Sequence, residues 1–364
     1  MSFITSSRTF IIAEIGTAHG GSFEKAKELV DAAVYAGADC VKFQIVYAHE
    51  ILHPDTGFVK LPTGNIPLYN RFKELEVNPE FYRMCNDYCK KRNILFSASP
   101  FGLQSLKELA DLTPAALKIA SPELNHFPLL QAINDNYNKF PLILSSGVSK
   151  LSDIEKALEA TERVKTKALL HCITAYPAPE EEYNLKLIEN LNSIFGLPVG
   201  VSDHSMHPVL VPVLSVACGG SIIEKHICLS RKDSGLDDPV AVEPDDFAKM
   251  VKTVRNAEKQ TPSEIIAEMS SEYGNEKVLR ILGTGRKELA PAEKQNYTRT
   301  NRSIHFMRSM KKGDVISAND IGVLRTEKIL SPGISPEFYN IVLGAELVRD
   351  VQNGSGLVWA DVLS

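Results

Sequence analysis

Short apolar runs alternate with longer amphipathic stretches over most of the chain. The runs predict strands at 10–14, 40–44, 95–99, 116–121, 142–146, 168–172, 199–203 and 222–226. The amphipathic stretches predict helices at 23–36, 78–92, 103–111, 127–135, 150–163, 185–194, 208–217 and 244–260. Eight strand-then-helix units over about 260 residues are typical of a (β/α)8 TIM barrel. A doubly wound open sheet is the alternative, but no Gly-x-Gly-x-x-Gly motif follows the first predicted strand.

The pattern changes in the last quarter of the chain. It loosens from about residue 261, and the polar stretch ELAPAEKQNYTRTN predicts a linker. From 301 onwards, short β-like pieces and the turns KKGD and NGSG predict a small strand-rich domain. We therefore expect a barrel over 1–283, a linker over 284–300 and a second domain over 301–364. A domain of about 60 residues buries little core by itself, so it should pack on its own barrel or on a partner's.

Composition excludes several classes of protein. The chain of 364 residues has a net charge of −5 without a basic cluster, which argues against nucleic acid as a partner. It contains no apolar run of membrane-spanning length, and its N-terminal stretch lacks the pattern of a secretory signal. The six cysteines are scattered without metal-ligand spacing, so we expect reduced, buried thiols in a cytoplasmic protein.

Reactive side chains follow the predicted strands, where each strand ends. Because TIM-barrel active sites lie at the C-terminal ends of the strands, these side chains should converge on one face. Two lysines in apolar strands predict an anionic ligand, while ion pairs with Glu14 and Glu123 that close the barrel top are the alternative. The residues at these ends are Glu14, Lys42, Gln44, Ser97, Ser99, Lys118, Ser121, Glu123, Ser145, Ser146, His171, Thr174, Tyr176, Ser202, Asp203, His204, Glu224, Lys225 and His226.

Two histidines are candidate metal ligands. His204 and His226 end the seventh and eighth predicted strands, which are neighbours in a barrel, and Glu14 lies on the strand that closes it. Two imidazoles and a carboxylate leave open positions, as a catalytic divalent site requires, and mixed nitrogen and oxygen ligands are compatible with manganese. A structural role for each histidine is the alternative.

Several segments together resemble one enzyme family. IIAEIGTAHGGS, AGADCVKFQ, SASPF, LKIASPEL, LHCITAYPAP, GVSDHS and IIEKHICLSRKDSGLDD occur in the order found in the sialic acid (N-acetylneuraminate) synthase family. The last 60 residues or so resemble the antifreeze-like (SAF) domain that ends these enzymes. The resemblance covers nearly the whole chain, and the ordered set is specific although each motif alone is weak.

The resemblance implies a manganese-dependent transferase. Such an enzyme condenses phosphoenolpyruvate with N-acetylmannosamine, or a related 2-acylamino sugar, to a nine-carbon 2-keto sugar acid and phosphate. By position, His204 and His226 match the metal ligands, and Glu14 and Glu123 match carboxylates that could act as the base. The residues that match phosphoenolpyruvate contacts are Lys42, Ser99 (usually threonine), Lys118, Ser121, Ser145 and Ser202.

The same resemblance implies the acceptor site and the assembly. Gln44, Glu123, Tyr176 and Asp237 match the contacts with the acceptor sugar. Arg325 matches an arginine of the terminal domain that reaches the acyl-amino group of the sugar in the partner's barrel. The family forms a domain-swapped homodimer, which would also stabilise a small terminal domain.

Three departures from the family pattern affect the identity of the sugar. Ala18 and Thr174 stand where asparagine is usual, and Asn301 stands where some members have an aromatic residue. A synthase for a legionaminic- or pseudaminic-type acid, or for a surface or spore-coat polysaccharide sugar, is therefore an alternative. A synthase acting on phosphorylated aldoses is disfavoured by the SAF domain. A non-catalytic sugar-binding protein is disfavoured by the intact set of strand-end residues.

Overall fold

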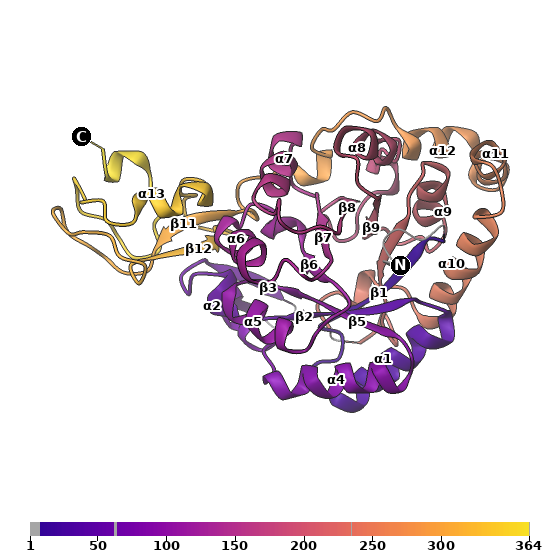
Figure 1. The fold of residues 1–364 in the computed structure, drawn as a ribbon, viewed down its shortest axis with the longest axis horizontal. Coiled ribbons are helices and arrows are strands. Elements are labelled where there is room, and N and C mark those ends of the chain that lie inside the picture. Colours follow the sequence, from indigo (N-terminus) through magenta and orange to yellow (C-terminus); the bar gives the residue numbers. More distant parts are fainter. Residues whose placement is uncertain (1–7, 62–63, 234, 364) are drawn as a thin grey trace.

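The structure is a computed structural model that describes residues 8–61, 64–233 and 235–363. Eight parallel strands close into a barrel in the order β1-β10-β9-β8-β7-β6-β5-β2 (Figure 1). This order confirms the TIM barrel and excludes the open sheet. The barrel strands are β1 (Phe10–Gly16), β2 (Cys40–Ile45), β5 (Leu95–Pro100), β6 (Leu117–Ile119), β7 (Leu142–Ser145), β8 (Lys167–Cys172), β9 (Val199–Asp203) and β10 (Ile222–His226).

Helices surround the barrel, and the eight expected ones are present. Ser22 and Asn78 cap the first two of them by accepting bonds from the backbone N–H groups of Lys25 and Phe81. These helices are α1 (Phe23–Ala36), α4 (Pro79–Lys91), α5 (Leu103–Asp111), α6 (Phe127–Asn136), α7 (Leu151–Glu159), α8 (Leu187–Phe195), α9 (Leu210–Ala217) and α10 (Pro244–Ala257).

Two regions are more regular than the sequence pattern predicted. Residues expected to be irregular after 261 form α11 (Pro262–Tyr273) and α12 (Asn275–Leu282). A capping box between Thr261 and Glu264 starts α11, and this signal was overlooked. The connection from β2 to α4 forms an insert of α2 (Ala48–Ile51), β3 (Phe58–Leu61), β4 (Gly64–Pro67) and α3 (Leu68–Lys73).

The alternation of side chains along the barrel strands separates the core from the site. On β1, Phe10 and Ile12 belong to an apolar cluster, whereas Glu14, two residues on, lines a cavity. On β10, Ile222 belongs to the same cluster and Glu224 lines the cavity. The alternating positions Ile11, Ala13 and Ile223 belong instead to the main apolar cluster, which includes residues of the surrounding helices. The barrel interior is therefore filled by apolar side chains at one end and by polar ones at the C-terminal end of the strands.

The C-terminal part forms a small body at one side of the barrel (Figure 1). Its two strands, β11 (Arg302–Phe306) and β12 (Ile321–Arg325), are antiparallel and lie over a small apolar cluster. The expected strand near the end is instead a short 3-10 helix, η7 (Trp359–Asp361). Bends and single bridges replace the other expected strands. The domain boundaries stay predictions, and their ends at residues 1 and 364 lie outside the described residues.

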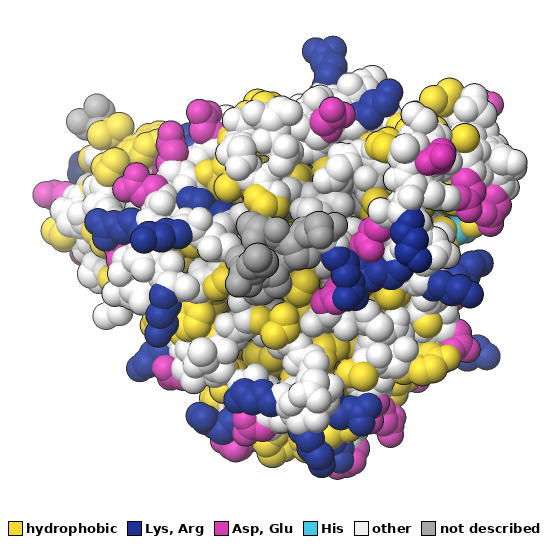
Figure 2. Space-filling view, turned by 45° about the vertical axis from the view of Figure 1, so that its right-hand side comes forward, with side chains coloured by type: hydrophobic (Ala, Val, Ile, Leu, Met, Phe, Trp, Pro, Cys, Tyr) yellow, Lys and Arg dark blue, Asp and Glu magenta, His cyan; other side chains and the backbone are white. Residues whose placement is uncertain are grey.

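This C-terminal part contacts the β2–α4 insert of its own chain. Leu52 forms a β-bridge with Arg325, and the Thr56 hydroxyl donates to the Thr326 carbonyl at 2.9 Å. On the face drawn in Figure 2, acidic and basic side chains are interspersed. Among the described residues, no helix is long and apolar enough to cross a membrane. All six cysteines are free and buried, as expected.

Candidate active site

A cavity of about 450 Å³ lies at the C-terminal ends of the barrel strands. Its lining brings together every residue to which the family resemblance gives a role, except Glu123. Their roles stay predictions, but their placement on one surface confirms that the strand ends converge. The predicted residues that line the cavity are Glu14, Lys42, Gln44, Ser99, Lys118, Ser121, Ser145, Tyr176, Ser202, His204, His226, Asp237 and Arg325.

Four buried charges form the floor of the cavity. Lys42 Nζ lies 2.7 Å from Glu14 and 3.8 Å from Glu224, and Lys118 Nζ lies 3.6 Å from Glu224. We call Lys42, Lys118, Glu14 and Glu224 the charged floor. The expected alternative of ion pairs is thus present, but its second carboxylate is Glu224 and not Glu123. When all four groups are ionised, their charges cancel.

Serine hydroxyls surround the charged floor. Lys118 donates to Ser145 at 2.7 Å, and Lys42 donates to Ser99 at 3.2 Å. Ser202 donates to Glu224 at 3.0 Å. Hydroxyls can donate or accept, so these serines can turn from the floor to the oxygens of a bound anion.

Burial and neighbouring charges shift the pKa values of the two floor carboxylates in opposite directions, up for Glu14 and down for Glu224. Burial raises the pKa of Glu14, although Lys42 opposes the shift. Burial also acts to raise the pKa of Glu224, but Lys118 and Lys42 outweigh it and hold that pKa at about 2. Burial lowers the pKa of Lys118. Of the two carboxylates, Glu14 is therefore the better proton acceptor near neutral pH.

The two candidate metal ligands lie side by side in the cavity. The ring centroids of His204 and His226 are 5.7 Å apart, and the Tyr176 ring stacks on His204 at 4.2 Å. His204 Nδ1 lies 2.8 Å from the Ile173 carbonyl, which can only accept, so Nδ1 carries a proton. In the neutral ring the other nitrogen, Nε2, carries a lone pair, and it lies 3.2 Å from the Tyr176 hydroxyl, whose place a metal would have to take.

The pKa values of the two histidines differ. Burial lowers the pKa of His226 to about 4, which leaves a neutral imidazole suited to a metal. Burial lowers that of His204 too, but Cys172 outweighs it and raises the pKa to about 9, so a metal would have to displace a proton there. In the described part of the chain, no group of three or more His, Cys, Asp or Glu is placed to hold a metal. Glu14 pairs with Lys42 and does not complete the expected ligand set.

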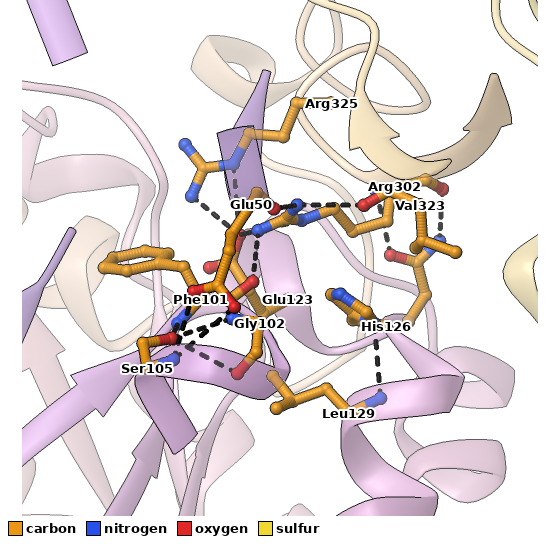
Figure 3. A network of polar contacts seen from close by, with 11 residues as sticks. Glu50, Phe101, Gly102, Ser105, Glu123, His126, Leu129, Arg302, Val323 and Arg325 are labelled. Carbon is orange, nitrogen blue, oxygen red and sulfur yellow. Dashed lines mark hydrogen bonds and ion pairs between the residues drawn. The ribbon is translucent and has the colours of Figure 1, made fainter. Parts of the chain in front are cut away.

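Glu123 is fully buried and does not line the cavity, although its neighbours Ser121 and Pro122 do. Its Oε1 accepts from Arg325 at 2.7 Å and from Arg302 at 2.9 Å (Figure 3). We call Arg302, Glu123 and Arg325 the arginine network. Arg325 lines the cavity of its own chain, and no partner chain is needed for this contact. An exchanged domain would make the same contacts with the partner's barrel, so the swapped dimer stays a prediction.

Several strand-end residues lie outside the cavity. The Lys225 ammonium and the Asp203 carboxylate lie 2.5 Å apart outside the cavity. Their side chains point away from it because they alternate with Ser202 and Glu224 along β9 and β10. His171 also lies outside the cavity and contacts the Tyr183 carbonyl. The strand-end residues that do not line the cavity are Ser97, Ser146, His171, Asp203 and Lys225, besides Glu123.

Part of the cavity lining had no role predicted from the sequence. Glu224 was expected at the strand ends without a role, and the alternation along β10 places it in the cavity with His226. An apolar wall of the cavity comes from the β2–α4 insert and a neighbouring loop. It could not be assigned to the site from the sequence, because the insert was not predicted. Its residues are Val59, Leu68, Phe72, Leu75 and Leu236.

The three departures from the family pattern have different surroundings. Thr174 lines the cavity, and its hydroxyl is one of the buried polar atoms without a hydrogen-bond partner in the described part of the chain. Asn301 donates to the Val148 carbonyl at 3.0 Å, where the linker meets the barrel. Ala18 is buried and does not line the cavity. Thr174 is therefore the departure placed to contact a ligand.

Known proteins match both parts of the chain. A NeuB family model matches residues 29–265, and a SAF domain model matches residues 301–363. The chain is 33% identical to the spore coat polysaccharide biosynthesis protein SpsE of Bacillus subtilis, over 97% of this chain and 93% of that protein. It is 31% identical to an N,N'-diacetyllegionaminic acid synthase of Legionella pneumophila, over 98% of this chain and 96% of that protein.

The fold agrees with these matches. The crystal structure of the Bacillus subtilis SpsE protein superposes with a TM-score of 0.81 at 32% identity, covering 98% of this chain and 96% of that one. The matches extend through the barrel, the linker and the C-terminal part. The chain therefore belongs to the NeuB family and ends in a SAF domain.

Proposed function

We propose that this protein condenses phosphoenolpyruvate with a 2-acylamino sugar to give a nine-carbon 2-keto sugar acid and phosphate. The observation that carries the proposal is the cavity lining. It joins two buried lysines, a set of serines and two histidines at the catalytic face of a TIM barrel. Family membership and the synthase named among the relatives support the same reaction.

Phosphoenolpyruvate would bind over the charged floor. Lys42 and Lys118 offer two ammonium groups, and Ser99, Ser145 and Ser202 offer hydroxyls, to the phosphate and carboxylate oxygens. Since two carboxylates neutralise the lysines in the free chain, an incoming anion must compete with Glu14 and Glu224. Additional positive charge in the cavity would therefore favour binding of the anion.

The two imidazoles suit a divalent cation such as Mn²⁺ only in part. His204 and His226 would hold it, and the open positions would be filled by water or substrate, since among the described residues no third His, Cys, Asp or Glu is grouped with them to hold a metal. When bound, such a cation would polarise the aldehyde oxygen of the acceptor. The chain's own residues would orient both substrates and handle the protons.

The chain would hold the acceptor with other residues of the cavity lining. Gln44, Tyr176, Asp237 and Arg325 line the cavity and carry donors and acceptors for hydroxyl and acyl-amino groups. Carbon 3 of phosphoenolpyruvate then attacks the aldehyde carbon. Water adds at carbon 2, and the phosphate leaves with its bridging oxygen.

Glu14 is the better candidate for accepting the proton from this water. It lines the cavity, and burial raises its pKa. Glu123, the other candidate from the sequence, is enclosed and already bonded to two arginines. We assign Glu123 instead to holding Arg325 at the cavity.

Phosphate release tests the proposal. The chain is incubated with phosphoenolpyruvate, Mn²⁺ and a panel of acceptors that includes N-acetylmannosamine, diacetamido-trideoxy hexoses and phosphorylated aldoses. We expect release that depends on both the metal and one of the 2-acylamino sugars. Release with a phosphorylated aldose alone, or with none of the acceptors, contradicts the proposal.

A further inference from the structure

Arg302, at the start of β11, is a fully buried arginine at the junction of the C-terminal part and the barrel. Its side chain is 0% exposed, which is costly unless its donors are all satisfied. Nε and Nη2 donate to Glu123, Nη1 donates to the carbonyls of Glu50 and Val323, and Nη2 also donates to the Phe101 carbonyl. These bonds use all five donors of the guanidinium, so its position is fixed.

Glu123 connects Arg302 to a second arginine, Arg325, by accepting hydrogen bonds from both. Its Oε1 accepts from Arg302 at 2.9 Å and from Arg325 at 2.7 Å, whereas its buried Oε2 has no hydrogen-bond partner among the described residues. Figure 3 shows contacts from both guanidinium groups meeting at the Glu123 carboxylate. Only Arg325 of this network lines the cavity.

Strand register explains why one carboxylate serves both arginines. Arg302 and Arg325 are opposite each other in the β11–β12 pair. Like charges directly opposite destabilise a strand pair, so a shared anion is needed between them. Glu123 lies just past the end of β6 and supplies that anion from the barrel. The network therefore joins the C-terminal part to the cavity.

We propose that Arg302 is a positioning residue that fixes Arg325 through Glu123 and thereby sets the affinity for the acceptor sugar. The proposal rests on the proposed function, because it assumes that Arg325 contacts the acceptor. A purely structural role for Arg302 predicts something different. It would change the stability of the protein, or both Michaelis constants alike, without selecting one substrate.

The test is Arg302→Lys, which keeps the charge but loses the five-donor fork. We expect the KM for the acceptor to rise about tenfold, while the KM for phosphoenolpyruvate changes by less than about twofold. In an Arg325→Ala background, the same substitution should change the acceptor KM by less than about twofold, because its effect passes through Arg325. A full tenfold further change in that background would overturn the proposal.

Arg299→Lys is the matched control. Arg299 also bonds to backbone carbonyls of the C-terminal part, those of Glu327, Lys328 and Leu330, but it does not contact Glu123. We expect it to leave the acceptor KM within about twofold of wild type. An equal rise in the control would assign the effect to general loosening of the domain and overturn the proposal.

Glu123→Gln keeps the test decisive if Arg302→Lys does not fold, as judged by thermal unfolding. It retains the shape of the side chain and should give the same selective rise in the acceptor KM. An unchanged acceptor KM would overturn the proposal. Absence of turnover in the wild-type chain with every acceptor would overturn the proposed function as well. Wild-type turnover with non-selective variants would overturn this inference alone.

Discussion

The charged floor and the arginine network are two buried charge clusters at one cavity, and they are built differently. In the floor, two lysines face two carboxylates, and all four groups line the cavity. In the network, two arginines share one carboxylate oxygen, and only Arg325 reaches the cavity. The floor can exchange its internal partners for a ligand, whereas the network holds one side chain in place. Chemistry is therefore assigned to the floor and recognition of the acceptor to the network.

Loss of either histidine beside the floor should have the largest effect. His204→Ala and His226→Ala should each lower kcat by about three orders of magnitude or more, because each removes one of two imidazoles from an open site. Thermal unfolding should show both variants folded, and binding of Mn²⁺ should weaken in a calorimetric titration. His49→Ala, at an exposed position, is the control. Near-normal activity after chelation and return of Mn²⁺ would refute the metal assignment.

Substituting the two carboxylates should separate the floor from the network. Glu14→Gln should lower kcat by roughly 10²-fold or more, the usual contribution of a general base, without raising either KM, because it also removes a negative charge with which the incoming anion competes. Glu123→Gln should instead raise the acceptor KM and leave kcat within a few-fold of wild type. Steady-state kinetics with each substrate varied would measure both. If Glu123→Gln lowered kcat and Glu14→Gln did not, Glu123 would be assigned as the base instead.

Substituting a lysine inside the cavity should change substrate binding, whereas substituting one outside it should change stability alone. Lys118→Met should raise the KM for phosphoenolpyruvate by one to two orders of magnitude, since a charged hydrogen bond contributes roughly 1.5–3 kcal/mol. Lys225→Met is the comparison, because Lys225 is equally buried but pairs with Asp203 outside the cavity. It should lower the free energy of unfolding by roughly 3–5 kcal/mol and leave that KM unchanged. Equal kinetic effects would contradict the assignment of the floor.

Mixing a metal-site variant with an acceptor-site variant, at an acceptor concentration far below the raised KM of Arg325→Ala, tests which barrel the network serves in a dimer. If the C-terminal parts are exchanged, His226→Ala and Arg325→Ala chains together form one complete site per mixed dimer. Each mixed dimer should then regain towards half of the wild-type activity, which is about a quarter for a fully exchanged equimolar mixture. Labelled subunits would show that exchange has occurred. No recovery despite exchange would place Arg325 on its own barrel, as in the single chain described.

The barrel and most of its site could be predicted from the sequence because the apolar and polar residues that form them recur at short, regular spacings along the chain. Strand runs separated by helical patterns fixed the (β/α)8 order, and the strand ends located the cavity. Alternation within each strand was not applied, which is why Asp203 and Lys225 were grouped with the site and Glu224 was not singled out. Applied to β9 and β10, a period of two separates these residues correctly.

Other features depend on contacts that no local pattern reveals. The insert before α4 packs through residues such as Leu68 and Phe101, which come from separate segments. Arg302 begins an unremarkable polar-to-apolar stretch, and nothing near it indicates that its side chain is buried against Glu123, 179 residues away. The 3-10 helix at Trp359–Asp361 also replaced a strand that the apolar run favoured. Tertiary packing decided each case.

Mass spectrometry of the product tests the central claim most directly. The protein is incubated with phosphoenolpyruvate, Mn²⁺ and the acceptor that releases phosphate, and the product is analysed without derivatisation. The account predicts one new acid whose mass is that of the acceptor plus a pyruvate unit, formed in equal amount with phosphate. Free pyruvate and phosphate with unchanged acceptor, or no new species with any 2-acylamino sugar, would contradict it.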